Sequence, residues 1–215
     1  MITKKKRYGI YLIGLLVLAF GIVMVKKANL GVSPITSIPS AASNLTPLTL
    51  GTTQTLFHVF CIGLQALLVR RITLSLLLQL PLSVAFGVLI DLYMAVLPFS
   101  PEQFLPRCGV CMVGIVCTAL GLVCVVSVDM ILTAPDSLSR LISRLTGRPL
   151  GRIKLMLDML WTVLSTAVEW LLLGTVLSVG LGTAASALLT GNLVTLFQRW
   201  FRPLAEAAGE SRETG

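Results

Sequence analysis

The sequence predicts an all-α membrane protein of six transmembrane helices, arranged as two inverted halves of three helices each. Three observations support this fold class. Hydrophobic residues make up 55% of the 215-residue chain and charged residues only 12%, against roughly 25% charged residues in soluble domains. The mean hydropathy is +0.92, and the apolar stretches are continuous rather than alternating, which favours helices over a β-barrel. The third observation is an internal repeat.

The repeat relates residues 21–61 to residues 121–161 at an offset of one hundred residues. Its identities are few, but they fall at turns and helix boundaries, where the sequence constrains the backbone most. They are Gly21 and Gly121, Thr46 and Thr146, Leu50 and Leu150, and Gly51 and Gly151. A doubled hydrophobic chain is typical of transporters that bind their solute between two halves.

Six apolar segments each have about the 20 residues that a helix needs to cross a bilayer. They are residues 8–27, 50–69, 72–97, 108–128, 152–174 and 176–197. The polar, proline-rich stretch 98–107 separates the halves, 8–97 and 108–197, within a single membrane domain at 1–202. Residues 203–215 are predicted to be a disordered cytoplasmic tail. The first segment is interpreted as an uncleaved membrane helix, because lysines follow it instead of a signal-peptidase site.

The distribution of positive charge predicts the orientation of the chain. With the N-terminus placed in the cytoplasm, fourteen of the 17 lysines and arginines fall on the cytoplasmic side. This distribution is the one expected of membrane proteins, so both termini are predicted to be cytoplasmic. Each half has three spans, and the halves therefore cross the membrane in opposite senses. The net charge of +8 has the same explanation, and no basic-aromatic motif for nucleic acid occurs.

The segments 28–49 and 129–150, which follow the first span of each half, are predicted to be broken or re-entrant. Ser33-Pro34 and Thr133-Ala134-Pro135 are typical of helix starts. Paired broken segments indicate a solute site at mid-membrane, where half-helix N-termini favour anions. The predicted substrate-binding residues are Asn29, Ser33, Thr36, Asp129, Thr133 and Asp136. The alternative is that both segments are interfacial helices, as the apolar face of 138–145 also allows.

Three ionisable residues inside the apolar segments, His58, Asp91 and Asp158, are predicted to couple solute movement to ions or protons. The alternative for His58 is a hydrogen bond to Gln54, and for Asp158 it is a pair with Lys154 one helical turn earlier. Glu169 is interpreted as an interfacial anchor. The small residues of the sixth segment, such as Gly182 and Ser186, indicate close helix packing.

No catalytic motif occurs in the chain, so no enzymatic activity is predicted. The five cysteines include Cys108 and Cys111 in a C-x-x-C pattern. No second pair and no neighbouring histidine completes a zinc site. We therefore interpret the cysteines as packing residues, and we predict neither a metal nor a cofactor.

Two segments resemble a known family. ANLGVSPITSIPSAAS follows the first span and GLGTAASALLTGNLVTLF lies in the last. Both are similar to segments of the YitT/YczE-type bacterial integral membrane proteins. The resemblance implies a multi-pass protein of the bacterial cytoplasmic membrane, and it implies no activity because the members are largely uncharacterised.

The function predicted from these features is that of a small secondary transporter. It would move a small polar solute, either anionic or zwitterionic, by alternating access. One alternative is a channel. Another is a non-transporting membrane partner of a cytoplasmic protein held by the basic residues of 138–154. Lipid and the solute are the predicted partners, and six helices of this length also suggest a homodimer.

Overall fold

The computed structural model describes residues 4–128 and 131–213, with side chains described for residues 5–128 and 131–200. The described residues form α-helices and one short 3₁₀ helix, with no strand among them. The predicted all-α class is therefore confirmed. In chain order the elements are α1 (Lys4–Ala28), η1 (Pro34–Thr36), α2 (Ser37–Leu45), α3 (Leu50–Val69), α4 (Leu74–Val96), α5 (Phe104–Ser127), α6 (Ala134–Thr146), α7 (Leu150–Leu173) and α8 (Leu181–Glu213).

Five described helices, α1, α3, α4, α5 and α7, are long and apolar enough to cross a membrane. The chain thus has the make-up of a multi-pass membrane protein. The sixth predicted span corresponds to α8, which begins at Leu181 and is not among these five, because small and hydroxyl-bearing residues lower its hydropathy. α8 continues to Glu213 through the residues predicted as a disordered tail, where leucine, alanine and glutamate favour a helix.

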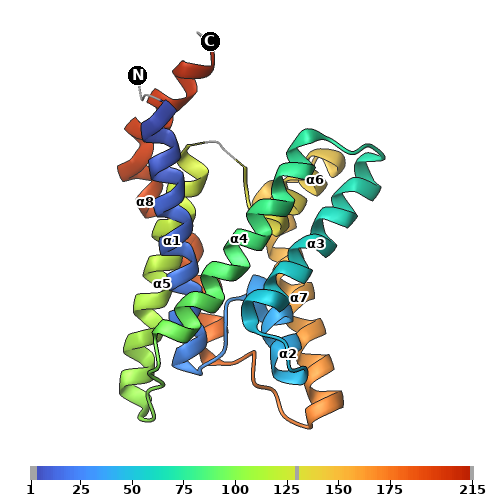
Figure 1. The fold of residues 1–215 in the computed structure, drawn as a ribbon, viewed down its shortest axis with the longest axis vertical. Coiled ribbons are helices and arrows are strands. Elements are labelled where there is room, and N and C mark those ends of the chain that lie inside the picture. The colour runs from blue at the N-terminus through green and yellow to red at the C-terminus, as the bar shows by residue number, and fades with distance from the viewer. Residues whose placement is uncertain (1–3, 129–130, 214–215) are drawn as a thin grey trace.

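The most extensive helix contact joins α1 and α5, which run antiparallel side by side (Figure 1). Gly14 and Gly21 of α1 lie against Gly121 and Gly114 of α5. A Cβ added at Gly21 would lie 2.5 Å from the backbone nitrogen of Thr118, and one at Gly121 would lie 2.7 Å from the carbonyl oxygen of Gly14. The backbones approach so closely that glycine is required at this four-glycine contact.

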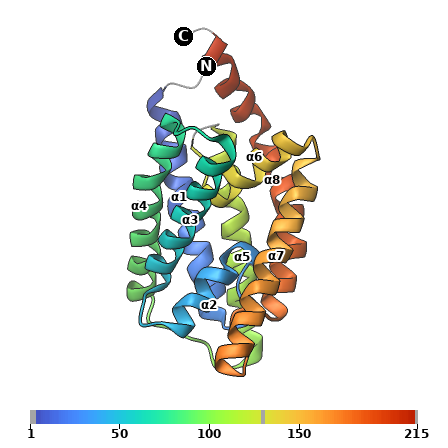
Figure 2. The same ribbon diagram turned by 90° about the vertical axis from the view of Figure 1, so that its right-hand side faces the viewer.

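Several of the other helix contacts come in corresponding pairs. α4 packs on α1, and α8 packs on α5. The short helix α2 packs on α3 and α7, and the short helix α6 packs on α7 and α3. The two short helices lie toward opposite ends of the bundle, as Figures 1 and 2 show. They are the helices predicted after the first and fourth spans. Pro34 begins η1, which leads directly into α2, and Pro135 lies in the first turn of α6.

The contact between α3 and α4 has no counterpart in the second half. α3 and α4 pack closely at Gly51 and Gly87, where a Cβ on either glycine would collide with the carbonyl oxygen of the other. Gly151 corresponds to Gly51, but nothing lies within 4 Å of its Cβ position. In the described structure α7 and α8 hardly touch, and α8 lies along α5 instead. The second half is therefore open where the first half is closed.

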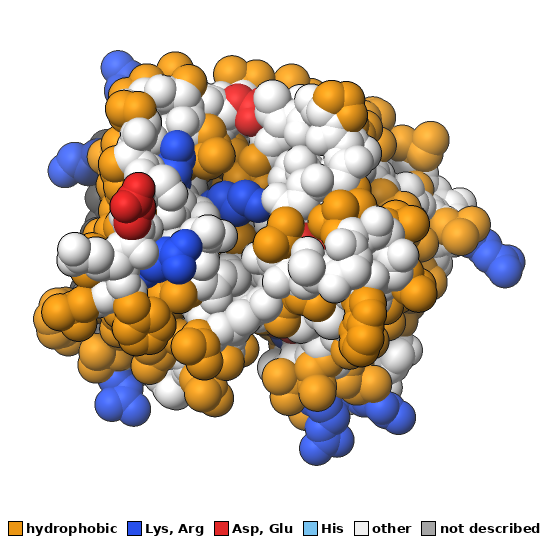
Figure 3. Space-filling view, turned by 90° about the horizontal axis from the view of Figure 1, so that it is seen from below, with side chains coloured by type: hydrophobic (Ala, Val, Ile, Leu, Met, Phe, Trp, Pro, Cys, Tyr) orange, Lys and Arg blue, Asp and Glu red, His pale blue; other side chains and the backbone are white. Residues whose placement is uncertain are grey.

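The outer surface is suited to lipid. Leu67, Leu105 and Leu171 are 73%, 81% and 82% exposed, which is unusual for leucine in water but expected of a helix that faces hydrocarbon. Seen from the end that carries α2, hydrophobic side chains make up much of the perimeter (Figure 3).

We expect Gly21→Ala to destabilise the protein by about 1–3 kcal/mol, because the new methyl group forces α1 away from α5. Gly9→Ala is the matched control, since it lies in the same helix with nothing within 4 Å of its Cβ position. The control should be neutral or slightly stabilising because alanine favours helices over glycine. The thermal unfolding midpoint in detergent measures both variants, and equal midpoints would contradict the four-glycine contact.

Candidate functional site

A cavity of about 440 Å³ lies between the helices and is here called the central cavity. Its wall is mostly apolar, but every surrounding element except α1 and α4 contributes polar side chains. These are Ser33 and Thr36 before and in η1, Gln54 and His58 on α3, Thr118 on α5, Thr133, Asp136, Ser139 and Arg140 at α6, Lys154 and Asp158 on α7, and Ser186, Thr190 and Gln198 on α8.

Many lining residues occupy positions one hundred residues apart. Gln54 and His58 on α3 correspond to Lys154 and Asp158 on α7, and the spacing of four places each pair on one helix face. The other such pairs are Leu18 and Thr118, Ile22 and Leu122, Ser33 and Thr133, Ile35 and Pro135, Thr36 and Asp136, and Phe86 and Ser186. The cavity wall thus draws on the same places in both halves of the chain.

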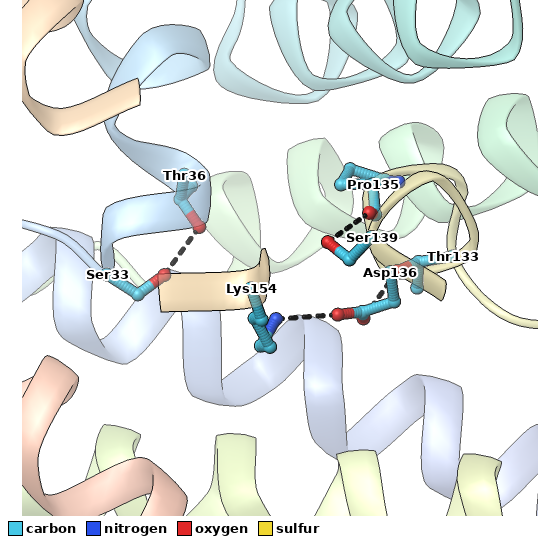
Figure 4. A network of polar contacts seen from close by, with 7 residues as sticks. All are labelled: Ser33, Thr36, Thr133, Pro135, Asp136, Ser139 and Lys154. Carbon is cyan, nitrogen blue, oxygen red and sulfur yellow. Dashed lines mark hydrogen bonds and ion pairs between the residues drawn. The ribbon is translucent and has the colours of Figure 1, made fainter. Parts of the chain in front are cut away.

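An ion pair holds α6 and α7 together at the cavity wall (Figure 4). Lys154 Nζ donates to Asp136 Oδ1 at 2.7 Å, and Thr133 Oγ1 donates to Asp136 Oδ2 at 2.8 Å. Burial by itself would raise the pKa of Asp136, but the charge of Lys154 and the hydrogen bonds from Lys154 and Thr133 outweigh it and lower the pKa. Asp136 lies in the first turn of α6, where a carboxylate is stabilised by the helix dipole.

The first half presents hydroxyl groups at the corresponding place. Ser33 and Thr36 share a hydrogen bond of 2.7 Å between their hydroxyl oxygens (Figure 4). Thr36 is buried and holds the position that Asp136 holds in the second half. The predicted residues Ser33, Thr36, Thr133 and Asp136 therefore meet at one cavity, with a carboxylate on one side and hydroxyls on the other.

Two buried polar atoms in the wall have no hydrogen-bond partner in the described structure. Gln54 contacts His58 through its amide nitrogen at 2.9 Å, and its Oε1 is unpartnered. Turning the amide over would leave the nitrogen unpartnered instead. The second atom is Ser186 Oγ. Both side chains are 2% exposed, and buried polar groups without a partner are rare in folded proteins.

The remaining predicted site residues are distributed differently. His58 and Asp158 both line the central cavity. Asn29 follows the last residue of α1 with φ of +52° and is exposed, so it serves as the end of that helix and is not among the lining residues. Asp129 lies outside the described residues.

Asp91 lies outside the cavity lining and holds α4 against the start of α3. Its carboxylate accepts hydrogen bonds from Thr49 Oγ1 at 2.6 Å and from the Gly51 N–H at 2.7 Å. A carboxylate is stabilised at a helix N-terminus, so this contact gives Asp91 a structural role, and its coupling role stays a prediction. The corresponding residue of the second half is Gly191, so no such contact holds α8 against the start of α7.

A second polar cluster joins α2, α7 and the connection to α8. Glu169 is fully buried. It accepts hydrogen bonds from the backbone N–H groups of Leu177 and Ser178 at 2.9 and 2.8 Å. It also accepts from the Ser178 hydroxyl at 2.7 Å and from Asn44 Nδ2 at 2.8 Å. Glu169 therefore holds α2 and the α7–α8 connection together inside the protein. It is not the interfacial anchor that the sequence indicates.

Lys26 completes this cluster from α1. Its Nζ donates to Ser40 Oγ at 2.8 Å and to Asn44 Oδ1 at 3.0 Å, so Asn44 bridges Lys26 and Glu169. The same region is tied down by the backbone: the Gly182 N–H donates to the Leu30 carbonyl at 2.7 Å. Lys26, Ser40, Asn44, Glu169 and Ser178 form what we call the Glu169 network.

Three residues that line the cavity are not predicted from the sequence as site residues. The sequence indicates only local pairing for Gln54 and Lys154 and only helix packing for Ser186, whereas all three line the cavity. The available signal is the repeat itself, since Gln54 and Lys154 precede His58 and Asp158 by one turn at the offset of one hundred residues.

The described residues contain no group of three His, Cys, Asp or Glu side chains that could hold a metal ion. All five cysteines are free thiols. Cys111 is buried in an apolar cluster with Val25 and Ile115, which is the packing role that the sequence indicates.

The fold and the cavity define the class of this protein: all-helical among the described residues, with the make-up of a multi-pass membrane protein and a mostly apolar cavity that is lined in part by polar side chains. A family model described as "Family of unknown function (DUF6198)" matches residues 5–199, and the chain belongs to that family. No curated protein and no solved structure matches the chain. The resemblance to the YitT/YczE-type proteins stays a prediction.

Glu169→Ala is expected to lower the free energy of unfolding by about 3 kcal/mol, because it leaves the backbone N–H groups of Leu177 and Ser178 and the Asn44 amide without their acceptor. Glu102→Ala removes an exposed carboxylate and is the control, with an expected change below about 0.5 kcal/mol. Chemical denaturation in detergent, followed by tryptophan fluorescence, compares the two. A Glu169 variant as stable as the Glu102 variant would show that the network contributes little.

Proposed function

We propose that the protein is a small secondary transporter that moves a small anionic or zwitterionic solute by alternating access. The observation that carries the proposal is the central cavity. Its wall combines corresponding positions of both halves, and two buried polar atoms in that wall have no partner among the described residues. Transporters with internal repeats bind their solute at this kind of place, between the halves and near the middle of the membrane.

The charges in the cavity wall favour a zwitterion or an anion. Lys154 and Arg140 offer positive charge to a carboxylate, and Asp136 and Asp158 offer negative charge to an amine. Ser33, Thr36 and Thr133 supply hydroxyl groups, and Gln54 and Ser186 supply the unpartnered atoms. We assign coupling to ions or protons to His58 and Asp158, which face the same space from α3 and α7.

The proposed architecture is a three-plus-three inverted repeat in which α8 is the sixth span. The matching helix contacts of the two halves support it, as does the position of α2 and α6 toward opposite ends of the bundle. The excess of lysine and arginine on one side supports cytoplasmic N- and C-termini in a bacterial cytoplasmic membrane.

The difference between the halves suggests how the cavity opens. α3 and α4 are closed at Gly51 and Gly87, while Gly151 and Ala187, at the corresponding positions, both line the central cavity. We infer that α8 moves onto α7 in a second state and brings Gly151 and Ala187 into the same close contact. Small residues at both positions permit such an approach.

Uptake into proteoliposomes tests the function directly. A panel of labelled amino acids and small carboxylates, each with and without a pH gradient, should contain at least one solute that accumulates. Ser186→Ala should reduce that uptake at least about tenfold, because it removes a polar atom with no other partner. Thr195→Ala, on the same helix but outside the cavity lining, should leave it unchanged. Flat uptake across the whole panel would contradict the proposal.

Cross-linking tests the movement of α8. Gly151→Cys and Ala187→Cys, introduced together after replacement of the five native cysteines, should form a disulfide in the closed state. Solute should change the yield, because a ligand shifts the population of the state that it prefers. Gly151→Cys with Leu196→Cys is the control pair, since Leu196 lies outside the cavity lining. A folded double variant that never cross-links under oxidation would argue against closure.

A further inference from the structure

A second pocket, of about 620 Å³, lies where the start of α1 and the α3–α4 connection meet α6. Three arginines line it, Arg7 on α1 and Arg140 and Arg144 on α6. None of the described lining residues is acidic. We call it the arginine pocket, and the central cavity does not account for it, because Arg7 and Arg144 line only this pocket.

The arginines of α6 are arranged to receive a shared guest. Arg140 and Arg144 are one helical turn apart on the same face, where like charges repel. Neither guanidinium forms a hydrogen bond or an ion pair with a described residue. Arg7 is held in place by a hydrogen bond of 2.7 Å from its guanidinium to the Val128 carbonyl oxygen. An anion in the pocket would relieve the repulsion and meet donors that are already in position.

Other residues that line the pocket, on α4 and on α6, offer neutral hydrogen-bonding groups. Thr73 and Ser75, at the start of α4, and Ser137, in the first turns of α6, carry hydroxyl groups that line the pocket. Gln79 also lines it, and its Oε1 already accepts a hydrogen bond from Gln65 Nε2 at 3.2 Å. The Gln79 amide therefore has its N–H groups left to donate. Donors around the pocket, with no described carboxylate between them, fit a group with several acceptor oxygens.

We propose that the arginine pocket binds a phosphate group. A guanidinium presents a planar fork of N–H donors that matches two oxygens of a phosphate at once. The concave shape favours a small anionic group over the flat acidic surface of a protein. The start of α1 and helix α6, which line the pocket, lie at the end of the bundle that carries both chain termini (Figures 1 and 2). An end of a membrane bundle meets both lipid headgroups and water. The phosphate therefore has two sources, the headgroup of an anionic phospholipid or a soluble phosphate compound.

Thermal unfolding of the purified full chain in detergent tests the site and separates the two sources. One arm adds inorganic phosphate or pyrophosphate against sodium chloride of equal ionic strength. The other adds phosphatidylglycerol against phosphatidylcholine. A ligand that binds only the folded protein raises the unfolding midpoint, and the rise grows with the ratio of free ligand concentration to Kd. We expect a rise in at least one arm, and the arm that responds identifies the source.

The variants are Arg144→Gln and the double variant Arg140→Gln with Arg144→Gln. We expect the apparent affinity to fall about tenfold for each arginine removed. Arg148→Gln removes a nearby exposed arginine that does not line the pocket and should keep the full response. Gel filtration confirms that each variant is folded, and Arg144 is exposed, so its replacement should be tolerated. The proposal is overturned if neither arm responds, or if Arg148→Gln weakens binding as much as Arg144→Gln does.

Discussion

The close backbone contact between α1 and α5 is the constraint on which the rest of the structure depends. Lipid gives no hydrophobic drive for helices to associate, so dispersion and close packing must hold them together. Gly14, Gly21, Gly114 and Gly121 allow that packing because they place no Cβ atom between the two backbones. Once α1 and α5 are joined, α4 and α8 pack on them, and the central cavity lies beside this helix pair.

Much of this fold could be predicted from local sequence. The apolar run of α3 begins after Thr49, whose hydroxyl caps the helix, and ends at Arg70 in a left-handed conformation, and its predicted limits agree with the structure. Pro34 and Pro135 indicate the starts of the short helices because proline needs no N–H bond in the first turn. Ser33, Thr36, Thr133 and Asp136 follow from those starts. Helical spacing alone places His58 and Asp158 on polar faces.

Long-range partners could not be predicted in the same way. The bonds between Asn44 and Glu169 and between Asp91 and Gly51 depend on how whole helices cross, and no local pattern encodes a crossing angle. The offset of one hundred residues identifies corresponding positions, but it does not say which differences between them matter. Gly191 in place of Asp91 is one such difference. The α3–α4 hairpin, which contains Asp91, is closed, and the α7–α8 hairpin, which contains Gly191, is open.

The bonds around the first turn of α8 have a mechanical consequence. The Leu30 carbonyl accepts the Gly182 N–H, and Glu169 accepts the Ser178 N–H, so in the proposed movement of α8 this end of the helix would act as a pivot. With a rise of about 1.5 Å per residue, Gln198 lies roughly 24 Å along the helix from Gly182. A tilt of about 15° at the pivot would sweep that point sideways by ~6 Å, about the width of an amino-acid side chain. In the proposed transport cycle, the anchored turn would let a small tilt produce a large displacement at the far end of α8.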